Sequence, residues 1–510
     1  MKLKRDSAFG KFNSANLAAY AVIAAGILVA LLQFLNNHEM VQDEARVVFN
    51  IKDRSFAGLL RPLDYVQVAP ILFLWITKAL SFISPTSEQV YRVFPFVCFA
   101  ATLFLFLKFL NHYVKDKYAV VIILAFYTFN NMVLFFATEQ VKQYMGDVLV
   151  LFIIYYITAV RAFKTDRTRL LALGIAGTVF VFLSNVAPVI LFTAGVYLFY
   201  EEFFVTGRRR ILPYLPVFAA WLGSFAVYYF NFIADHPTYE FMADFWDYSF
   251  MPYHSLGATF HFLVERSEWT LSFFFPYSTP YLLKILFPAV GFAVLVYRRN
   301  FRLLILVLVP IMLHLILSAF RLYPVDVRMM LYLFPGIALL IGTGVYEISR
   351  FVLSFVKPVY FRVFALSVPV VLMVYYIGFL RPHQKQREVK ETMEYVNANI
   401  QEGEKIYLHW FVICNYLFYS DQGILDNMKK SQITDGQWTE FIAYKRGDLV
   451  QEFAGLKGRT WFLISGDSDE KIMTDHLESL GHTRLKEFHF SEGDWEGRAV
   501  SAAYLYDCGE

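Results

Sequence analysis

Long apolar runs alternate with short polar or basic segments from residue 17 to residue 380. A helical run of about 17–25 apolar residues matches the hydrocarbon thickness of a bilayer. The pattern therefore predicts a mainly α polytopic membrane protein with eleven spanning helices. These are Leu17–Leu35, Val93–Leu110, Tyr118–Ala137, Asp147–Arg161, Leu170–Asn185, Val189–Phe204, Ile211–Phe230, Tyr281–Tyr297, Leu303–Ala319, Met329–Tyr346 and Val363–Leu380.

One further apolar stretch, Val68–Ile83, is expected to lie along the membrane interface as a juxtamembrane helix. If it crossed the membrane, later basic clusters such as Arg208–Arg210 would face away from the basic N-terminus, against the positive-inside rule. Its mixed composition, with Trp75 and Lys78 among leucine and isoleucine, fits an interfacial helix. We therefore predict a multi-pass inner (plasma) membrane protein with a cytoplasmic N-terminus.

This topology places three long segments on the exterior, periplasmic or extracellular side, at 36–92, 231–280 and 381–510. Residues 1–380 are expected to form a membrane domain, and 381–510 a small soluble α/β domain. In the soluble domain the pattern predicts a helix at Arg387–Ile400. Its strand-like runs are Lys405–Leu408, Thr460–Ile464, Lys471–Leu480 and Val500–Tyr506.

Composition agrees with a membrane protein, since 57% of the 510 residues are hydrophobic and only 17% are charged. The net charge of +3 comes from short basic clusters, which are typical of topology signals and not of a nucleic-acid surface. Three cysteines, Cys98, Cys414 and Cys508, are too scattered for a disulfide framework or a zinc site. We expect no nucleic-acid partner and no metal or other cofactor.

Ionisable residues avoid the centres of the predicted spans, which contain no aspartate or glutamate. A transporter would carry such residues at mid-membrane. His314 is the one candidate there, and we interpret it as a hydrogen-bonded structural residue. Acids and bases gather instead at the exterior ends of helices, where they would meet a substrate that has a lipid tail and a polar head.

Four exterior segments carry the candidate site residues. Each segment alone is also compatible with a solvated loop or charged turn. Arginines that stay outside, against the positive-inside bias, favour a bound anion, with contact to lipid headgroups as the alternative. The candidates are Asp43, Glu44, Arg46, Asp64, Tyr65, Gln67, Lys142, Tyr144, Asp147, Arg321, Tyr323 and Arg328.

In their order along the chain, these segments resemble the C-type membrane glycosyltransferases (GT-C), in particular the branch of the protein O-mannosyltransferases and the lipid A aminoarabinose transferase. The family's acidic pair after the first helix is matched by Asp43-Glu44. Its juxtamembrane proline is matched by Pro70, and the arginine that opens its second span by Arg92. The resemblance covers the chain from the first span to about Pro335.

Two later motifs extend the resemblance, and one position departs from it. Lys142, Tyr144 and Asp147 match the second exterior loop, and the segment from Arg328 to Pro335 matches a late arginine-tyrosine motif. Where the family commonly has histidine or lysine before the juxtamembrane proline, this chain has Val68-Ala69. Another cation is then required for the donor phosphate. The four alternatives are Arg46, Lys142, Arg321 and Arg328.

The resemblance implies transfer of a sugar from a polyprenyl-phosphate donor to a glycan, lipid or protein acceptor at the exterior face. Asp43 or Glu44 would be the catalytic carboxylate, with Asp43 favoured as the general base of an inverting displacement. Asp64, Tyr65, Gln67, Tyr144, Asp147 and Tyr323 would contact substrate. A divalent cation at Asp43, Glu44 and Asp147 stays an alternative. So do a ligase with a lipid-pyrophosphate donor, a flippase of lipid-linked glycans, and a non-catalytic scaffold.

Overall fold

The computed structural model describes residues 14–160, 163, 165–234, 236–383, 389–409, 412–433, 453, 456–465, 467–490 and 501–509. The chain forms two compact units. The first comprises Met1–Phe34, Ala69–Phe73 and Phe94–Tyr376, and the second Leu35–Val68, Leu74–Val93 and Ile377–Glu510. Helices α1, α3, α4 and α17 contribute to the boundaries of both units.

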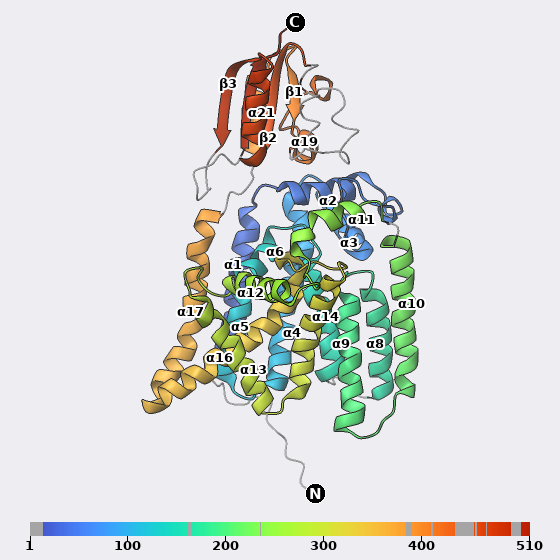
Figure 1. Ribbon diagram of the computed structural model, residues 1–510, viewed down its shortest axis with the longest axis vertical. Coiled ribbons are helices and arrows are strands. Elements are labelled where there is room, and N and C mark those ends of the chain that lie inside the picture. The colour runs from blue at the N-terminus through green and yellow to red at the C-terminus, as the bar shows by residue number, and fades with distance from the viewer. Residues whose placement is uncertain are drawn as a thin grey trace. The chain divides into compact units, whose positions relative to one another are not determined.

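The first unit is helical. Its helices are α1 (Ser14–Asn36), α4 (Glu88–Tyr113), α5 (Lys117–Thr128), α6 (Asn131–Thr138), α7 (Tyr144–Tyr155), α8 (Asp166–Phe180), α9 (Ala187–Tyr200), α10 (Leu215–Phe232), α11 (Tyr239–Phe245), α12 (Leu256–Ser272), α13 (Tyr281–Tyr297), α14 (Phe301–Ala319), α15 (Val327–Met330), α16 (Phe334–Val352) and α17 (Pro358–His383). Figure 1 shows α8, α9 and α10 as neighbouring upright helices.

Each of the eleven predicted spans overlaps helix among the described residues, although Leu170–Asn185 continues five residues past the end of α8. Seven helices there are long and apolar enough to cross a membrane, or eight when the bent pair α5 and α6 counts as one span. α7 and α13 are shorter apolar helices, and α8 has 15 residues. The prediction of eleven spans is therefore matched in position, while the number that cross the membrane stays a prediction.

The predicted span Tyr118–Ala137 is wrong as a single straight helix, because α5 and α6 meet at a 55° bend. The bend lies at Asn130, whose side chain accepts hydrogen bonds from the amides of Met132 (3.0 Å) and Val133 (3.2 Å). Asparagine is a favoured N-cap, so it begins a new helix at this point. Its amide nitrogen donates to the Phe273 carbonyl after α12, which fixes the direction of the break.

Glycines allow a close helix contact in the first unit, between α13 and α16. A Cβ added to Gly291 would lie 2.0 Å from the Leu340 carbonyl oxygen, and one added to Gly344 would lie 1.9 Å from that of Phe287. Small residues of this kind let two backbones approach inside an apolar medium. The pair is thus locked at positions where no larger residue fits.

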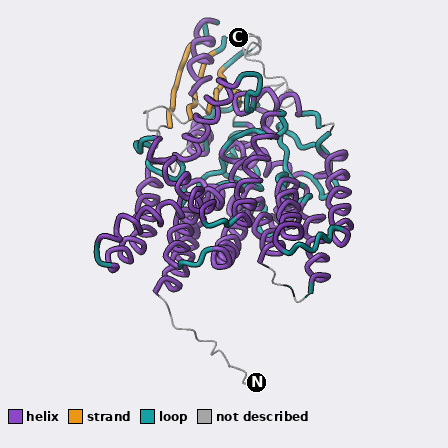
Figure 2. Tube along the Cα trace, turned by 60° about the horizontal axis from the view of Figure 1, so that its bottom comes forward, coloured by secondary structure: helices purple, strands orange, loops and turns teal. Residues whose placement is uncertain are grey.

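The second unit contains α2 (Gln42–Asp53), α18 (Lys390–Asn399), α19 (Ile413–Ser420), α21 (Asp467–Ser479) and one four-stranded sheet. The strands are β1 (Lys405–Leu408), β2 (Arg459–Ser465), β3 (Thr483–Phe490) and β4 (Ser501–Asp507), in the order β1-β2-β4-β3. β1 and β2 are parallel, and the other pairs are antiparallel. Figure 2 shows the strands gathered in one small sheet.

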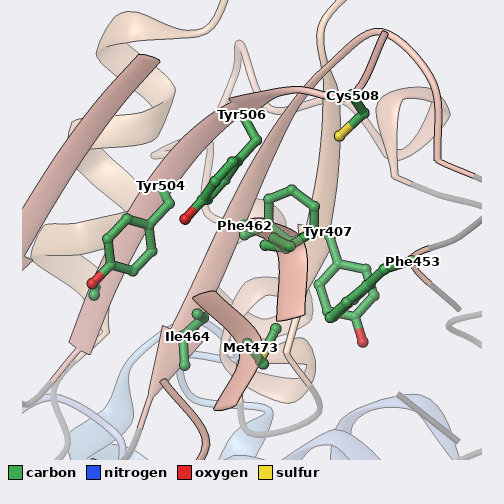
Figure 3. Packing of buried hydrophobic residues seen from close by; sticks show 10 residues of the cluster. Tyr407, Phe453, Phe462, Ile464, Met473, Tyr504, Tyr506 and Cys508 are labelled. Carbon is green, nitrogen blue, oxygen red and sulfur yellow. The ribbon is translucent and has the colours of Figure 1, made fainter. Parts of the chain in front are cut away.

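The core of the sheet is aromatic, as Figure 3 shows. Tyr407, Phe462 and Tyr506 from three strands pack together with Met473 and Leu477 of α21. Met473 and Leu477 are four residues apart, so they lie on one helix face. The predicted strand at Lys471–Leu480 is therefore wrong, and this run lies in α21 and its C-terminal end.

The juxtamembrane stretch forms α3 (Ile71–Ser81), with 11 residues. A helix of this length spans about 16 Å, roughly half of the ~30 Å hydrocarbon core. It is therefore too short to cross a bilayer by itself, in line with the predicted interfacial position. Lys78 is buried, and its ammonium donates to the Ile51 carbonyl at 2.8 Å.

Candidate active site

Helix α2 carries the acidic pair in its first turn. The Glu44 carboxylate accepts a hydrogen bond from the Val41 amide at 3.1 Å, which satisfies a donor at the helix start. The N-terminal end of a helix also favours negative charge. The two acids differ in exposure, since Glu44 is fully buried and Asp43 is half-buried. Neighbouring side chains on a helix point in different directions, and here only Asp43 reaches the surface of the second unit.

Glu44 is bound to Arg92 in a two-pronged ion pair. Arg92 Nε donates to Oε1 at 2.9 Å and Nη2 donates to Oε2 at 2.8 Å. Arg92 is 2% exposed and also donates to the carbonyls of His38 (2.7 Å) and Glu39 (3.2 Å). The pair therefore fixes the chain between the end of α1 and the start of α2, and it assigns Glu44 a structural contact.

Arg46 follows on the same helix, three residues after Asp43, and is half-buried. Burial lowers the pKa of its guanidinium, and the nearby Asp43 carboxylate acts in the opposite direction. An arginine remains a cation at neutral pH under such conditions. Asp43 and Arg46 thus place one carboxylate and one cation within electrostatic reach of each other in the second unit.

Helix α19 of the C-terminal segment packs beside α2, and the sequence pattern did not indicate this contact. Asn415 Nδ2 donates to the Met40 carbonyl at 2.6 Å, and the Met40 amide donates to the Tyr419 hydroxyl at 3.1 Å. Tyr419 in turn donates to Glu88 at 2.5 Å. These residues are separated by more than 300 positions, so no local spacing could have revealed the contact.

Cys414, on the buried face of α19, is expected to resist alkylation. Burial raises the pKa of its thiol to about 12, while Arg46 acts in the opposite direction. Only the thiolate is nucleophilic, and at pH 8 the thiol is protonated. We predict that iodoacetamide at pH 8 leaves Cys414 unmodified in the folded protein, as measured by peptide mass spectrometry. A Lys429→Cys control at an exposed position should react readily; equal reaction at both sites would contradict the burial.

The remaining candidates of the first exterior segment lie on a tight turn after α2. Asp64 is exposed and forms a 2.7 Å ion pair with Arg54. Tyr65 has a φ of 61°, and burial is the main cause that raises its pKa. Gln67 Nε2 donates to the Tyr65 carbonyl at 3.2 Å. Tyr65 is therefore a neutral phenol at physiological pH, able to donate a hydrogen bond.

In the first unit, the turn into α7 brings Lys142, Tyr144 and Asp147 together, all of them buried. Gly146 leaves room for the Phe94 ring, which a Cβ would approach to 3.0 Å. Asp147 is 3% exposed, and its Oδ1 makes no hydrogen bond of ordinary geometry among the described residues. The Ser184 hydroxyl is the nearby group that acts on this carboxyl.

The late exterior loop is tied to the segment between α10 and α12. Arg321 forms an ion pair with Asp247 at 2.6 Å, and Arg328 lies 3.4 Å from Asp326 with its guanidinium 5.0 Å from the centre of the Trp246 ring. Ion pairs with Asp247 and Asp326 are therefore a second explanation, besides a bound anion, of why these arginines stay on the predicted exterior side. Both arginines have an acid of the protein as partner, and Arg321 is the weaker phosphate candidate because its ion pair is the shorter one, at 2.6 Å against 3.4 Å for Arg328.

His314 and Tyr323 occupy the adjoining helix end. The His314 ring is buried, with Nδ1 3.1 Å from the Tyr332 hydroxyl and Nε2 3.0 Å from the Pro324 carbonyl. Both ring nitrogens are engaged, as expected of a structural histidine. Tyr323 is half-buried, 5.3 Å from the His314 ring centre.

The candidate residues are divided between the two units of the chain. Asp43, Glu44 and Arg46 lie with Asp64, Tyr65 and Gln67 in the second unit, and the later candidates belong to the first. Within the described parts of the chain, no group of three or more histidine, cysteine, aspartate or glutamate residues is arranged to hold a metal ion. The divalent cation at Asp43, Glu44 and Asp147 remains an alternative that chelation of the purified protein would test.

Comparison with known proteins identifies the fold. No family model and no curated protein matches the sequence. Among solved structures, apo ArnT from Cupriavidus metallidurans aligns with a TM-score of 0.51 and 13% identity, over 96% of this chain and 98% of ArnT. The fold is that of ArnT.

Two further structures align over similar lengths. ArnT from the same organism bound to undecaprenyl phosphate gives a TM-score of 0.45 and 12% identity, over 95% of this chain and 97% of ArnT. The Archaeoglobus fulgidus oligosaccharyltransferase, in complex with zinc and sulfate, aligns with a TM-score of 0.48 and 10% identity. The alignment covers 96% of this chain and 73% of the oligosaccharyltransferase. The ArnT-like fold confirms the predicted fold class, a GT-C-like membrane helix array with a small C-terminal sheet.

Proposed function

We propose that the protein is a membrane glycosyltransferase that moves a sugar from a polyprenyl-phosphate carrier to an acceptor hydroxyl. The observation that carries the proposal is that the two neighbouring acids have different surroundings. Arg92 donates to both carboxylate oxygens of buried Glu44, while Asp43 is half-buried near Arg46. Glu44 thus has a structural contact, and Asp43, the more exposed of the two acids, is the one we propose as the base. The ArnT-like fold and the order of the exterior motifs support the same assignment.

In the proposed reaction Asp43 accepts the proton of the acceptor hydroxyl as its oxygen attacks the anomeric carbon. The bond between that carbon and the phosphate oxygen breaks, and polyprenyl phosphate leaves with the bonding electrons. A single displacement inverts the anomeric configuration. Cations near the phosphate stabilise the charge that develops on it. The lipid tail holds the donor at the membrane surface, so positioning supplies part of the rate.

The proposal is tested by incubating the purified protein with a radiolabelled polyprenyl-phosphate sugar and lipid, glycan or protein acceptor fractions. Thin-layer chromatography should show release of polyprenyl phosphate. Turnover only of a polyprenyl-pyrophosphate glycan would identify a ligase instead. Movement of intact donor between leaflets of a vesicle would identify a flippase. Neither turnover nor movement of the donor would indicate a non-catalytic scaffold.

Substitution of the proposed phosphate cations is expected to weaken donor binding. Arg46, Lys142 and Arg328 are cations at or near the predicted exterior loops, and a charge-assisted contact to phosphate contributes about 1.5–3 kcal/mol. Alanine at each should raise the Kd for the donor roughly 10- to 150-fold. Equilibrium binding of a fluorescent polyprenyl phosphate measures the effect. Arg321→Ala, which removes the partner of Asp247, serves as the comparison with a smaller expected change.

A further inference from the structure

A membrane-facing groove runs between α9 and α10 of the first unit. Trp221 on α10 packs against α8, where its Nε1 donates to the Leu173 carbonyl at 3.0 Å. Gly177 permits this contact, because a Cβ there would lie 2.1 Å from the same nitrogen. α10 is therefore fixed to α8, and a cavity of about 650 Å³ is left alongside α9.

The body of the groove is apolar. Its lining includes Leu191, Phe192, Phe199, Phe218, Leu222 and Phe225. Phe192 is 55% exposed and Leu222 69%, as expected of side chains that meet hydrocarbon. The groove follows α9 from Pro188 to Phe199. These residues are eleven positions apart, which is a rise of about 16 Å along the helix and close to the ~15 Å depth of one leaflet. The groove thus has the length and polarity for an acyl chain.

One end of the groove is polar and charged. It is lined by Glu202, Arg210 and Tyr214. Tyr214 donates to Glu202 Oε1 at 3.0 Å, and buried Arg169 donates to the Tyr214 hydroxyl at 3.4 Å. Arg169 Nε is buried and has no hydrogen-bond partner among the described residues. Exposed Arg208 and Arg209 add two charges beside Arg210.

Charge at this end favours an anion. The four arginines outnumber Glu202 and Asp166, the acids that act on Tyr214. The end also lies at the start of α10, whereas the predicted exterior segment 231–280 follows the end of α10. The basic end therefore lies at the opposite end of α10 from this predicted exterior segment.

We propose that this groove binds one anionic glycerophospholipid of the phosphatidylglycerol class. One acyl chain lies along α9, and the phosphate meets Arg210 at the basic end. Basic residues at the membrane surface attract anionic lipid, and a charge-assisted contact to phosphate adds specificity. The inference concerns a binding site separate from the proposed transferase chemistry and does not depend on it.

Native mass spectrometry of the full-length protein tests the site, with phosphatidylglycerol and phosphatidylcholine of identical chains as probes. One phosphatidylglycerol should bind about tenfold more tightly than phosphatidylcholine. Gly195→Phe should abolish binding of both lipids, because a side chain there enters the groove and meets only the Phe218 ring, at 3.8 Å. Gly223→Phe is the matched control on exposed α10 surface, with nothing within 4 Å of an added Cβ, and should bind normally.

Arg210→Ala keeps the test decisive if the groove variant does not fold, because Arg210 is exposed. It should lower phosphatidylglycerol affinity to that of phosphatidylcholine. Equal affinity of the wild-type protein for both lipids, or unchanged binding in Gly195→Phe and Arg210→Ala, would overturn the proposal. Displacement of phosphatidylglycerol by polyprenyl phosphate from the same groove would also overturn it, since the occupant would then be the carrier lipid.

Discussion

Asp43→Asn is expected to lower the single-turnover rate of sugar transfer by about 10²–10⁴, while donor affinity stays nearly unchanged. Asparagine keeps the shape of the side chain but cannot accept the proton of an acceptor hydroxyl. Because Asp43 is half-buried and at the first turn of α2, the substitution should leave the helix folded. Transfer is measured by quenched-flow mixing, with donor affinity measured in parallel.

Two further variants are needed to interpret the Asp43→Asn result. Asp64→Asn is the matched control, since Asp64 is an exposed acid of the same exterior segment in an ion pair with Arg54, and its transfer rate should stay within a few-fold of wild type. Glu44→Gln should reduce the yield of folded protein through loss of the Arg92 pair. An active Asp43→Asn enzyme together with a folded but inactive Glu44→Gln enzyme would move the base to Glu44.

Arg92→Met is expected to destabilise the second unit by about 3–5 kcal/mol, the usual cost of removing one partner of a buried ion pair. The substitution leaves the Glu44 carboxylate buried without the Arg92 cation, and it removes the hydrogen bonds that Arg92 donates to the carbonyls of His38 and Glu39. The thermal unfolding midpoint in detergent should fall. Transfer should fall with it, because α2 carries Asp43.

The Arg54–Asp64 pair supplies the control for stability. Both of its side chains are more exposed than those of the Arg92 pair, so Arg54→Met should cost about 0–1 kcal/mol. A double variant, Arg92→Met with Glu44→Met, removes both charges and should recover part of the lost stability. A fall in midpoint no larger for Arg92→Met than for Arg54→Met would contradict the buried pair.

Hydrophobic periodicity was enough to place the membrane helices, because bilayer thickness sets their length. It could not show the bend between α5 and α6, where one asparagine cap interrupts an apolar run. β3 was missed for a related reason. It is an edge strand with most side chains exposed, so it lacks the buried apolar pattern of β2. The run at Lys471–Leu480 was misassigned because Met473 and Leu477 are four residues apart. That spacing fits both the two-residue period of a strand and the 3.6-residue period of a helix.

The candidate site was only partly accessible from sequence. The position of Asp43-Glu44 after the first span indicated the acidic pair, but not which acid is engaged by Arg92, 48 residues away along the chain. Cys414, Asn415 and Tyr419 carry no motif, and only the folded second unit brings them to α2. The acids Asp247 and Asp326 beside the late arginines were likewise missed, because side-chain pairing across loops leaves no period in the sequence.

The most direct test of the central claim is the stoichiometry of the reaction catalysed by the purified protein. With a doubly labelled polyprenyl-phosphate sugar, we expect one polyprenyl phosphate released for each sugar transferred, inverted anomeric configuration in the product, and loss of both signals in Asp43→Asn. Sugar transfer without release of polyprenyl phosphate, or full activity of Asp43→Asn, would contradict the account.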